Sequence, residues 1–273
     1  MPIIECIPNI SEGRRQDVLD QCADAIRAAG ARLLDVKPDA THNRTVFTFA
    51  GEPGAVEAAV YALFDTALAA IDLRTHSGEH PRMGATDVCP FIPISGITME
   101  ETAEYSKKLA KRVGEELKLP VYLYENAQKN PARKNLSVIR AGEYEGFFKK
   151  IKQAEWKPDF GPAEFDAKRG ATVIGARDFL VAYNVNLNTT STRRANAVAF
   201  DIREAGRTKR ENGKIVNDEN GKPINIPGSL KCVKAIGVGA VRRCLHATQS
   251  IQVLDRNCNN GKVGLKRQIG RPP

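Results

Sequence analysis

Residues 31–50 read ARLLDVKPDATHNRTVFTFA, and this stretch decides the class of fold. Phe47 and Phe49 occupy every second position of residues 44–50, which is the period of a β-strand with two different faces. Residues 31–37 and 44–50 therefore predict a pair of strands joined by a polar connection.

Helices are predicted on both sides of this strand pair. A helix is expected over about 13–29, with Ser11 placed to cap its start and Gly30 placed to end it. An alanine-rich helix over about 53–73 follows the pair. The chain thus alternates between the two kinds of element.

The same mixture continues up to residue 124. A strand is predicted over 88–94, an amphipathic helix over 98–118 and another strand over 121–124. Together these elements predict an α/β (α+β) fold of two subdomains with mixed sheets and helices packed on the outer faces. No glycine-rich fingerprint opens a helix after the first strand, which argues against a nucleotide-binding Rossmann fold.

The stretch 126–170 is rich in Lys, Pro, Gly and Asp, and it predicts a linker into a second subdomain. The elements expected beyond it are a strand over 179–187, a helix over 191–205, a polar insertion over 207–226 with two Asn-Gly turns, and a strand over 230–236.

Three parts are therefore expected: an N-terminal subdomain over 1–177, an incomplete C-terminal subdomain over 178–237, and an atypical basic tail over 238–273. The tail holds seven Lys or Arg and one acidic residue, so it supplies +6 of the net charge of +9. It shows no sustained period of 2 or 3.6. Two interpretations stay open: a flexible basic tail, and a segment translated in a shifted frame, which would leave the second sheet one strand short.

Composition excludes several classes of protein. Apolar runs are broken by charge well before 18 residues, so no transmembrane helix is expected. No basic region precedes a long apolar core at the N-terminus, so we expect no signal peptide and a cytoplasmic location. The six cysteines lack C-x-x-C spacing and are expected to be reduced and mostly buried.

The most informative chemistry lies in residues 78–87, GEHPRMGATD. Its glycines and proline predict a loop that places His80 beside Glu79, Arg82 and Asp87. Histidine titrates near neutral pH, and arginine suits bidentate capture of a carboxylate. Unpaired buried charges are costly, so this cluster is a poor way to fill a core. The loop therefore predicts acid–base chemistry on an acidic substrate.

Other candidates have plain structural alternatives. His76 and His80 have the spacing of zinc ligands on a helix, but Gly78 and Pro81 break any helix there, so we predict no metal. Arg44 is either a substrate contact or a solvated edge cation.

Two further groups of candidate residues also have both a functional and a structural interpretation. Asp35 and Asp39, at a strand end and the next turn, either meet a ligand or stabilise the turn. Lys168 and Arg169 in residues 161–170, and Lys231 and Lys234 on a later strand, are anion-binding cations or surface charges.

Several motifs together carry a family resemblance. They are residues 5–13 (ECIPNISEG), 43–46 (NRTV), 76–85 (HSGEHPRMGA), 87–93 (DVCPFIP) and 139–145 (IRAGEYE). The chain closely resembles the folate-dependent glutamate formimidoyltransferase family, in the stand-alone bacterial form without a cyclodeaminase domain. The resemblance runs from Ile4 to about Gly237.

The resemblance implies two α/β subdomains whose sheets face each other across a folate-binding tunnel, in a homodimer. It implies transfer of the formimidoyl group from N-formimidoyl-L-glutamate to N5 of tetrahydrofolate, in histidine degradation, with tetrahydrofolate as co-substrate. The histidine matching His80 is the family's acid/base.

The resemblance also implies folate contacts in two segments. They are Gly161, Pro162, Ala163, Glu164, Phe165, Asp166, Ala167, Lys168, Arg169 and Gly170, and then Gly228, Ser229, Leu230 and Lys231 with the residues up to Gly237. From residue type, Arg82 and Arg44 are expected to hold carboxylates, and Glu79, Asp35 or Asp39 to stabilise the cationic migrating group.

Two competing functions remain. One is a folate-binding protein with weak or no turnover because the second subdomain is disrupted. The other is a nucleic-acid binder driven by the tail, which would bind with a strong salt dependence that disappears when residues 238–273 are deleted. The balanced charge of the first 237 residues argues against nucleic acid as a partner.

Overall fold

The computed structural model describes residues 1–273 except 79, 129, 190, 232, 239–248 and 257–273. The chain divides into two compact units, Met1–Asp178 and Phe179–Pro273. Within the described residues, no helix is long and apolar enough to cross a membrane.

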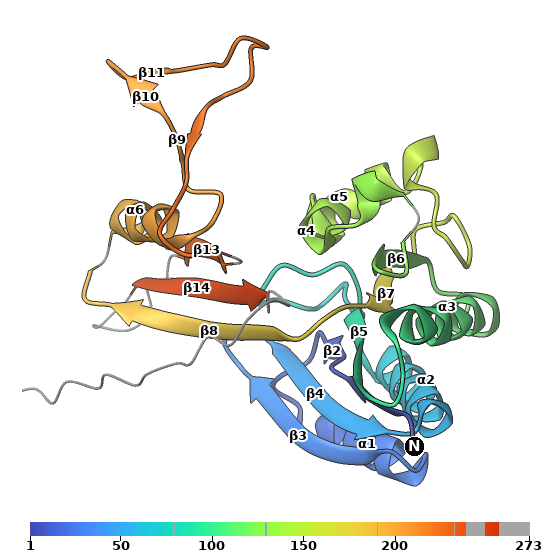
Figure 1. Cartoon of the computed structure of the whole chain (residues 1–273). Coiled ribbons are helices and arrows are strands. Elements are labelled where there is room, and N and C mark those ends of the chain that lie inside the picture. Colours follow the sequence, from blue (N-terminus) through green and yellow to red (C-terminus); the bar gives the residue numbers. More distant parts are fainter. Residues whose placement is uncertain (79, 129, 190, 232, 239–248, 257–273) are drawn as a thin grey trace, which may run out of the picture. The chain divides into compact units, whose positions relative to one another are not determined.

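The first unit is built on a seven-stranded mixed sheet (Figure 1). Its strands run in the order β1-β4-β2-β5-β7-β6, with β3 paired to β4 and β1 also paired to β5. The strands are β1 (Ile3–Cys6), β2 (Asn9–Ile10), β3 (Arg32–Asp39), β4 (Arg44–Gly51), β5 (Thr86–Ser95), β6 (Val121–Glu125) and β7 (Thr172–Ala176). The predicted pair is present: β3 and β4 are antiparallel, and Phe47 and Phe49 are fully buried.

Three long helices cover one face of this sheet: α1 (Gln16–Ala28), α2 (Pro53–Ala70) and α3 (Met99–Glu116). Their apolar residues form a large core with alternate side chains of the strands, including Leu123 of β6 and Cys89 of β5. Cys6, Cys22 and Cys89 are free buried thiols, as predicted. The other three cysteines lie outside the described residues.

The opposite face is covered by the stretch that was expected to be a linker, so that expectation is wrong. Residues 126–170 contain η1 (Pro131–Arg133), α4 (Leu136–Arg140), α5 (Glu143–Lys150) and η2 (Ala154–Trp156). Phe147 and Ile151 pack with Tyr122 of β6 in a second core. The physical reason is that few apolar side chains, widely spaced among Lys and Gly, suffice to dock short helices on an existing sheet face.

The second unit has a small antiparallel sheet in the order β13-β14-β8, with one helix against it. Its elements are β8 (Leu180–Leu187), α6 (Thr192–Ile202), β13 (Val233–Val238) and β14 (Gln249–Arg256). Ala195 and Ala199 of α6 pack against Val233 and Ala235. An added Cβ at Gly237 would lie 2.9 Å from the Ala195 side chain, so glycine permits this close approach.

The polar insertion forms an arm of short strand pairs that extends away from α6 (Figure 1). Strands β9 (Arg207–Thr208) and β12 (Asn225–Ile226) pair at its base, and β10 (Arg210–Glu211) and β11 (Lys214–Ile215) pair beyond them. Asn212 and Gly213 both have positive φ, 50° and 80°, which confirms the predicted tight turn.

The tail differs from expectation at one point. No strand was predicted beyond Gly237, yet β14 pairs with β13 on one side and with β8 on the other. Its sequence, QSIQVLDR, alternates Ile251 and Val253 with polar residues over a length too short to stand out in the basic tail. The rest of the tail lies largely outside the described residues, and the shifted-frame interpretation stays a prediction.

Candidate active site

The loop that carries His80 connects α2 to β5 and is fixed to its surroundings at several points. Ser11 donates its hydroxyl to the Gly84 carbonyl at 2.7 Å, and the Met83 N–H donates to a carboxylate oxygen of Asp87 at 2.8 Å. Ser11 was expected to cap α1, but the Glu12 carboxylate instead accepts from the N–H groups just before that helix. Ser11 is therefore an anchor of the histidine loop.

Glycines let this loop touch neighbouring backbone. A Cβ added at Gly84 would clash with the Ala171 carbonyl oxygen, and one added at Gly78 would clash with that of His42. Where a Cβ would collide with main chain, a side chain cannot move aside to relieve it. The loop therefore lies directly on the segments before β7 and before β4.

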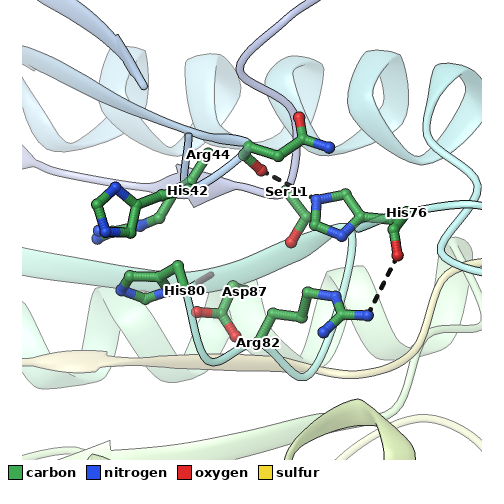
Figure 2. A pocket seen from close by; sticks show the side chains of 8 residues that line it. Ser11, His42, Arg44, His76, His80, Arg82 and Asp87 are labelled. Carbon is green, nitrogen blue, oxygen red and sulfur yellow. Dashed lines mark hydrogen bonds between the residues drawn. The ribbon is translucent and has the colours of Figure 1, made fainter. Parts of the chain in front are cut away.

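Eight side chains from four parts of the chain line a small pocket around His80 (Figure 2). They are Ser11, His42, Asn43, Arg44, His76, His80, Arg82 and Asp87. A neighbouring hollow of about 230 Å³ shares Ser11, Asn43 and His76 with this pocket. The predicted pair of His80 and Arg82 is thus joined by residues from the turn before β4, which lie far away in sequence.

His80 is held neutral in this pocket. Burial, together with the positive charges of Arg44 and Arg140, lowers the pKa of His80 to about 3. Its ring lies edge-on to that of His42, with 6.3 Å between ring centres (Figure 2). The neutral imidazole has a ring nitrogen free to accept a proton, but a pKa of about 3 makes it a weak base, since a general base works best with a pKa near the operating pH.

The ring of His76 is held by the backbone of Asn43. Its Nε2 lies 2.9 Å from the Asn43 carbonyl oxygen, so it is the protonated nitrogen that donates there. Burial lowers the pKa of His76 below its ordinary value. Within the described residues, no group of three or more His, Cys, Asp or Glu is placed to hold a metal ion.

The three arginines near His80 differ in how they are neutralised. Arg140 forms a 2.6 Å ion pair with buried Asp87, and Arg82 forms a 2.9 Å ion pair with Glu145. Arg44 forms no ion pair with the described side chains, whereas its buried Nε, like those of Arg82 and Arg140, has no hydrogen-bond partner among the described residues. Burial lowers the pKa of Arg44 to about 10. Arg44 is therefore the cation most in need of an anionic ligand.

The two candidate aspartates are placed differently. Asp39 accepts from the backbone N–H of His42 and lies 2.6 Å from its Nδ1. Burial raises the pKa of Asp39, but these contacts with His42 outweigh it, and the pKa lies below its ordinary value. Asp35 is exposed on β3, outside the residues that line the pocket. Glu79 lies outside the described residues.

The segment 161–170 lies against the histidine loop. The Ala85 N–H donates to the Arg169 carbonyl at 2.9 Å, and Gly84 bridges to Gly170, which has a φ of 70°. Asp166 organises the turn, because it accepts from the N–H groups of Lys168 and Arg169. The two regions that the resemblance links to catalysis and to folate are thus neighbours.

The other proposed folate segment belongs to the second unit. Ser229 and Leu230 donate their N–H groups to the carbonyls of Asp201 and Ile202, at the end of α6. Leu230 is 46% exposed, and Lys231 is exposed as well. An exposed leucine beside an exposed lysine leaves both apolar and cationic contacts open to a ligand.

Sequence reasoning did not single out several residues of the site. Asn43 and His42 were seen only as neighbours of Arg44, and Arg140 was only part of a motif. One signal was available for Arg140: an arginine that becomes buried must find a carboxylate.

Comparison with models of known protein families shows the family to which this chain belongs. The chain matches the family model of the formiminotransferase domain, N-terminal subdomain, over residues 3–177, and that of the formiminotransferase domain over residues 182–260. The chain belongs to the formiminotransferase family. The second match extends past Gly237 and includes β14.

Sequence identity to individual relatives shows how similar the chain is to named members of the family. The chain is 46% identical to the glutamate formimidoyltransferase of Streptococcus pyogenes serotype M1, over 75% of this chain and 69% of that protein. It is 46% identical to that of Thermoplasma acidophilum, over 74% of this chain and 68% of that protein. It is 50% identical to the formimidoyltransferase-cyclodeaminase of Mus musculus over 86% of this chain, but it spans only 41% of that longer protein.

Proposed function

We propose that this chain transfers the formimidoyl group from N-formimidoyl-L-glutamate to N5 of tetrahydrofolate, as a cytoplasmic enzyme of histidine degradation and as a homodimer. Its relatives named glutamate formimidoyltransferase, at 46% identity, support this activity. The observation that carries the proposal is the pocket lined by both neutral His80 and Arg44, a cation without an ion pair among the described residues.

His80 performs the proton transfers. It accepts the proton that N5 loses as the bond from N5 to the formimidoyl carbon forms, and it returns that proton to the amine of the departing glutamate. Holding one histidine between the two nitrogens makes both transfers intramolecular. His80 is only partly exposed, which limits the access of water to the proton in transit.

Arg44 and the carboxylates have complementary tasks. Arg44 binds a carboxylate of the glutamate portion, since it is the pocket arginine without an ion pair among the described residues. Asp39 holds His42 beside His80 and adds negative charge near the cationic formimidoyl group. Arg82 is already held by Glu145, so its task is to shape the loop rather than to capture substrate.

The residues present fit tetrahydrofolate. The aromatic rings of Phe165 and Tyr144 lie 5.5 Å apart beside the histidine loop, and Lys168 is exposed in the same segment. Flat rings of a pterin stack on such side chains, while lysines attract the carboxylates of a glutamate tail. We propose that residues 161–170 are folate contacts of the first unit, and that Gly228, Ser229, Leu230 and Lys231 are folate contacts of the second unit, taken by itself.

The test mixes purified protein with tetrahydrofolate and N-formimidoyl-L-glutamate and follows the absorbance of the folate product. We expect transfer by the wild type and loss of at least 100-fold in His80→Ala, in line with the contribution of a positioned acid–base group. Near-normal turnover in His80→Ala overturns the mechanism. Folate binding with no transfer by the wild type favours the folate-binding alternative.

A further inference from the structure

Tyr144 contacts both the histidine loop and the segment 161–170. Its backbone N–H donates to the Arg82 carbonyl at 2.7 Å, and its hydroxyl donates to the Ala167 carbonyl at 2.6 Å. Its ring lies 5.5 Å from that of Phe165, measured between centres. One side chain therefore joins the two regions to which the proposed function assigns acid–base chemistry and folate binding.

The contact to Arg82 follows from where Tyr144 lies in α5. The first N–H groups of a helix have no acceptor within the helix, so they bind groups outside it. Tyr144 is the second residue of α5, and its N–H finds the Arg82 carbonyl. In the same turn Glu145 forms its ion pair with Arg82, whose guanidinium carbon lies 5.5 Å from the centre of the Tyr144 ring. The start of α5 thus holds Arg82 by its backbone and by its side chain.

Other hydrogen bonds also join the histidine loop to the segment 161–170 and to Ala171 after it. These bonds do not reach Arg82 in the loop or Ala167 in the segment. The Ala171 N–H donates to the Met83 carbonyl, and the Ala85 N–H donates to the Arg169 carbonyl. Arg82 and Ala167 lie beyond these bonds, on the side of His80 and of Phe165. Among the described residues, Tyr144 bridges the carbonyls of these two outer residues.

We propose that Tyr144 is a positioning residue: it sets the separation between the His80 end of the loop and the Phe165 end of the segment 161–170. In doing so it aligns N5 of the bound tetrahydrofolate with the imidazole. This inference rests on the proposed function, since that function supplies both the proton transfer and the folate site. Tyr144 itself needs no contact with the reacting atoms.

The decisive variant is Tyr144→Phe. It keeps the ring, the backbone N–H and the tilted ring contact with Phe165, and it removes only the hydroxyl that donates to Ala167. Tyr122→Phe is a matched control, because the Tyr122 hydroxyl donates to the Trp156 carbonyl at 2.5 Å and Tyr122 lies outside the pocket. Both variants lose one tyrosine-to-carbonyl hydrogen bond in the same unit.

The expected results distinguish a positioning role of the Tyr144 hydroxyl in catalysis from a contribution to the stability of the fold alone. We expect both variants to melt within a few degrees of each other, while kcat falls about tenfold or more in Tyr144→Phe and less than twofold in Tyr122→Phe. We expect the KM for tetrahydrofolate to change less than kcat in Tyr144→Phe, because the hydroxyl does not bind the substrate. A kcat for Tyr144→Phe within twofold of the wild type, or an equal loss in Tyr122→Phe, overturns the inference.

A second measurement tests the role of Tyr144 even if the proposed function is wrong. If the wild type transfers no formimidoyl group, the proposed function fails. The imidazole NMR signal of His80 is then followed on addition of 5-formyltetrahydrofolate, with assignment by His80→Gln. A shift in the wild type that is at least halved in Tyr144→Phe supports the coupling. Equal shifts in the two proteins, or no shift in the wild type, overturn it.

Discussion

The carboxylate of Asp87 joins the histidine loop to α4, because one oxygen accepts the Met83 N–H while the other forms a 2.6 Å ion pair with Arg140. Both side chains are largely buried, with exposed fractions of 3% and 17%. Removing one partner of such a pair leaves a buried charge without compensation. We expect Asp87→Asn to lower the free energy of unfolding by about 3 kcal/mol in urea titrations.

An exposed ion pair is the control for this prediction. Lys111 and Glu115 lie one turn apart on α3 and are 61% and 60% exposed. Because water screens such a pair, Glu115→Gln is expected to change the free energy of unfolding by less than about 0.5 kcal/mol. Equal effects of Asp87→Asn and Glu115→Gln would show that the buried pair does not hold the loop.

His80 gives the folded protein a defined sensitivity to acid. The pKa of histidine is about 6.5 in an unfolded chain, and burial with Arg44 and Arg140 lowers it to about 3 in the fold. Between these values the unfolded state holds a proton that the folded state lacks. Stability therefore falls as the pH drops from about 6.5 to about 3, by up to about 1.4 kcal/mol per pH unit.

The variant His80→Gln removes this contribution. Urea unfolding at several values between about pH 4 and pH 6 should give a shallower pH dependence for His80→Gln than for the wild type. Identical slopes in the two proteins would mean that His80 is solvated and titrates normally in the fold.

Replacing Arg44 is expected to weaken the binding of N-formimidoyl-L-glutamate. Loss of a charge-assisted hydrogen bond costs about 1.5–3 kcal/mol, so Arg44→Met should raise the KM for N-formimidoyl-L-glutamate by about 10–100-fold. Arg44→Lys should recover part of this loss, since it restores the charge without the planar fork. Steady-state kinetics with this substrate varied are the measurement. An unchanged KM in Arg44→Met would assign the carboxylate to another residue.

Gly84 tests how closely the loop lies against the segment before β7. An added Cβ would clash with the Ala171 carbonyl oxygen and lie 3.1 Å from the Ala171 nitrogen. We expect Gly84→Ala to destabilise the protein by about 1–3 kcal/mol, the range for overpacked sites. Gly54→Ala is the control, because nothing lies within 4 Å of an added Cβ in α2. Thermal melts should show a loss for the first variant and no loss for the second.

The sequence allowed prediction of elements whose periodic patterns were long. Helices α1, α2 and α3 and the strand pair β3–β4 lie within a few residues of the ranges expected for them. Helices α4 and α5 were missed, because their few apolar residues complete a core that other elements begin. Strand β14 was missed for a related reason, since one of its pairing partners, β8, is distant in sequence.

The site was predicted in part. The loop with His80 and Arg82 was found, because its residue types lie together in sequence. The contributions of His42, Asn43 and Arg140 depend on how distant segments meet. The availability of Arg44 depends on which arginines already have carboxylate partners, and such pairing is a property of the folded pocket.

Strand β14 occupies the centre of the second unit's sheet, although it comes last among the described elements. During synthesis β8 therefore leaves the ribosome long before the strand that pairs with it. The first unit is complete by β7 and is able to fold meanwhile, but in the nascent second unit β8 lacks this pairing partner until β14 has been synthesised. A chain truncated before β14 would combine a folded first unit with an exposed strand edge that attracts chaperones or other nascent chains.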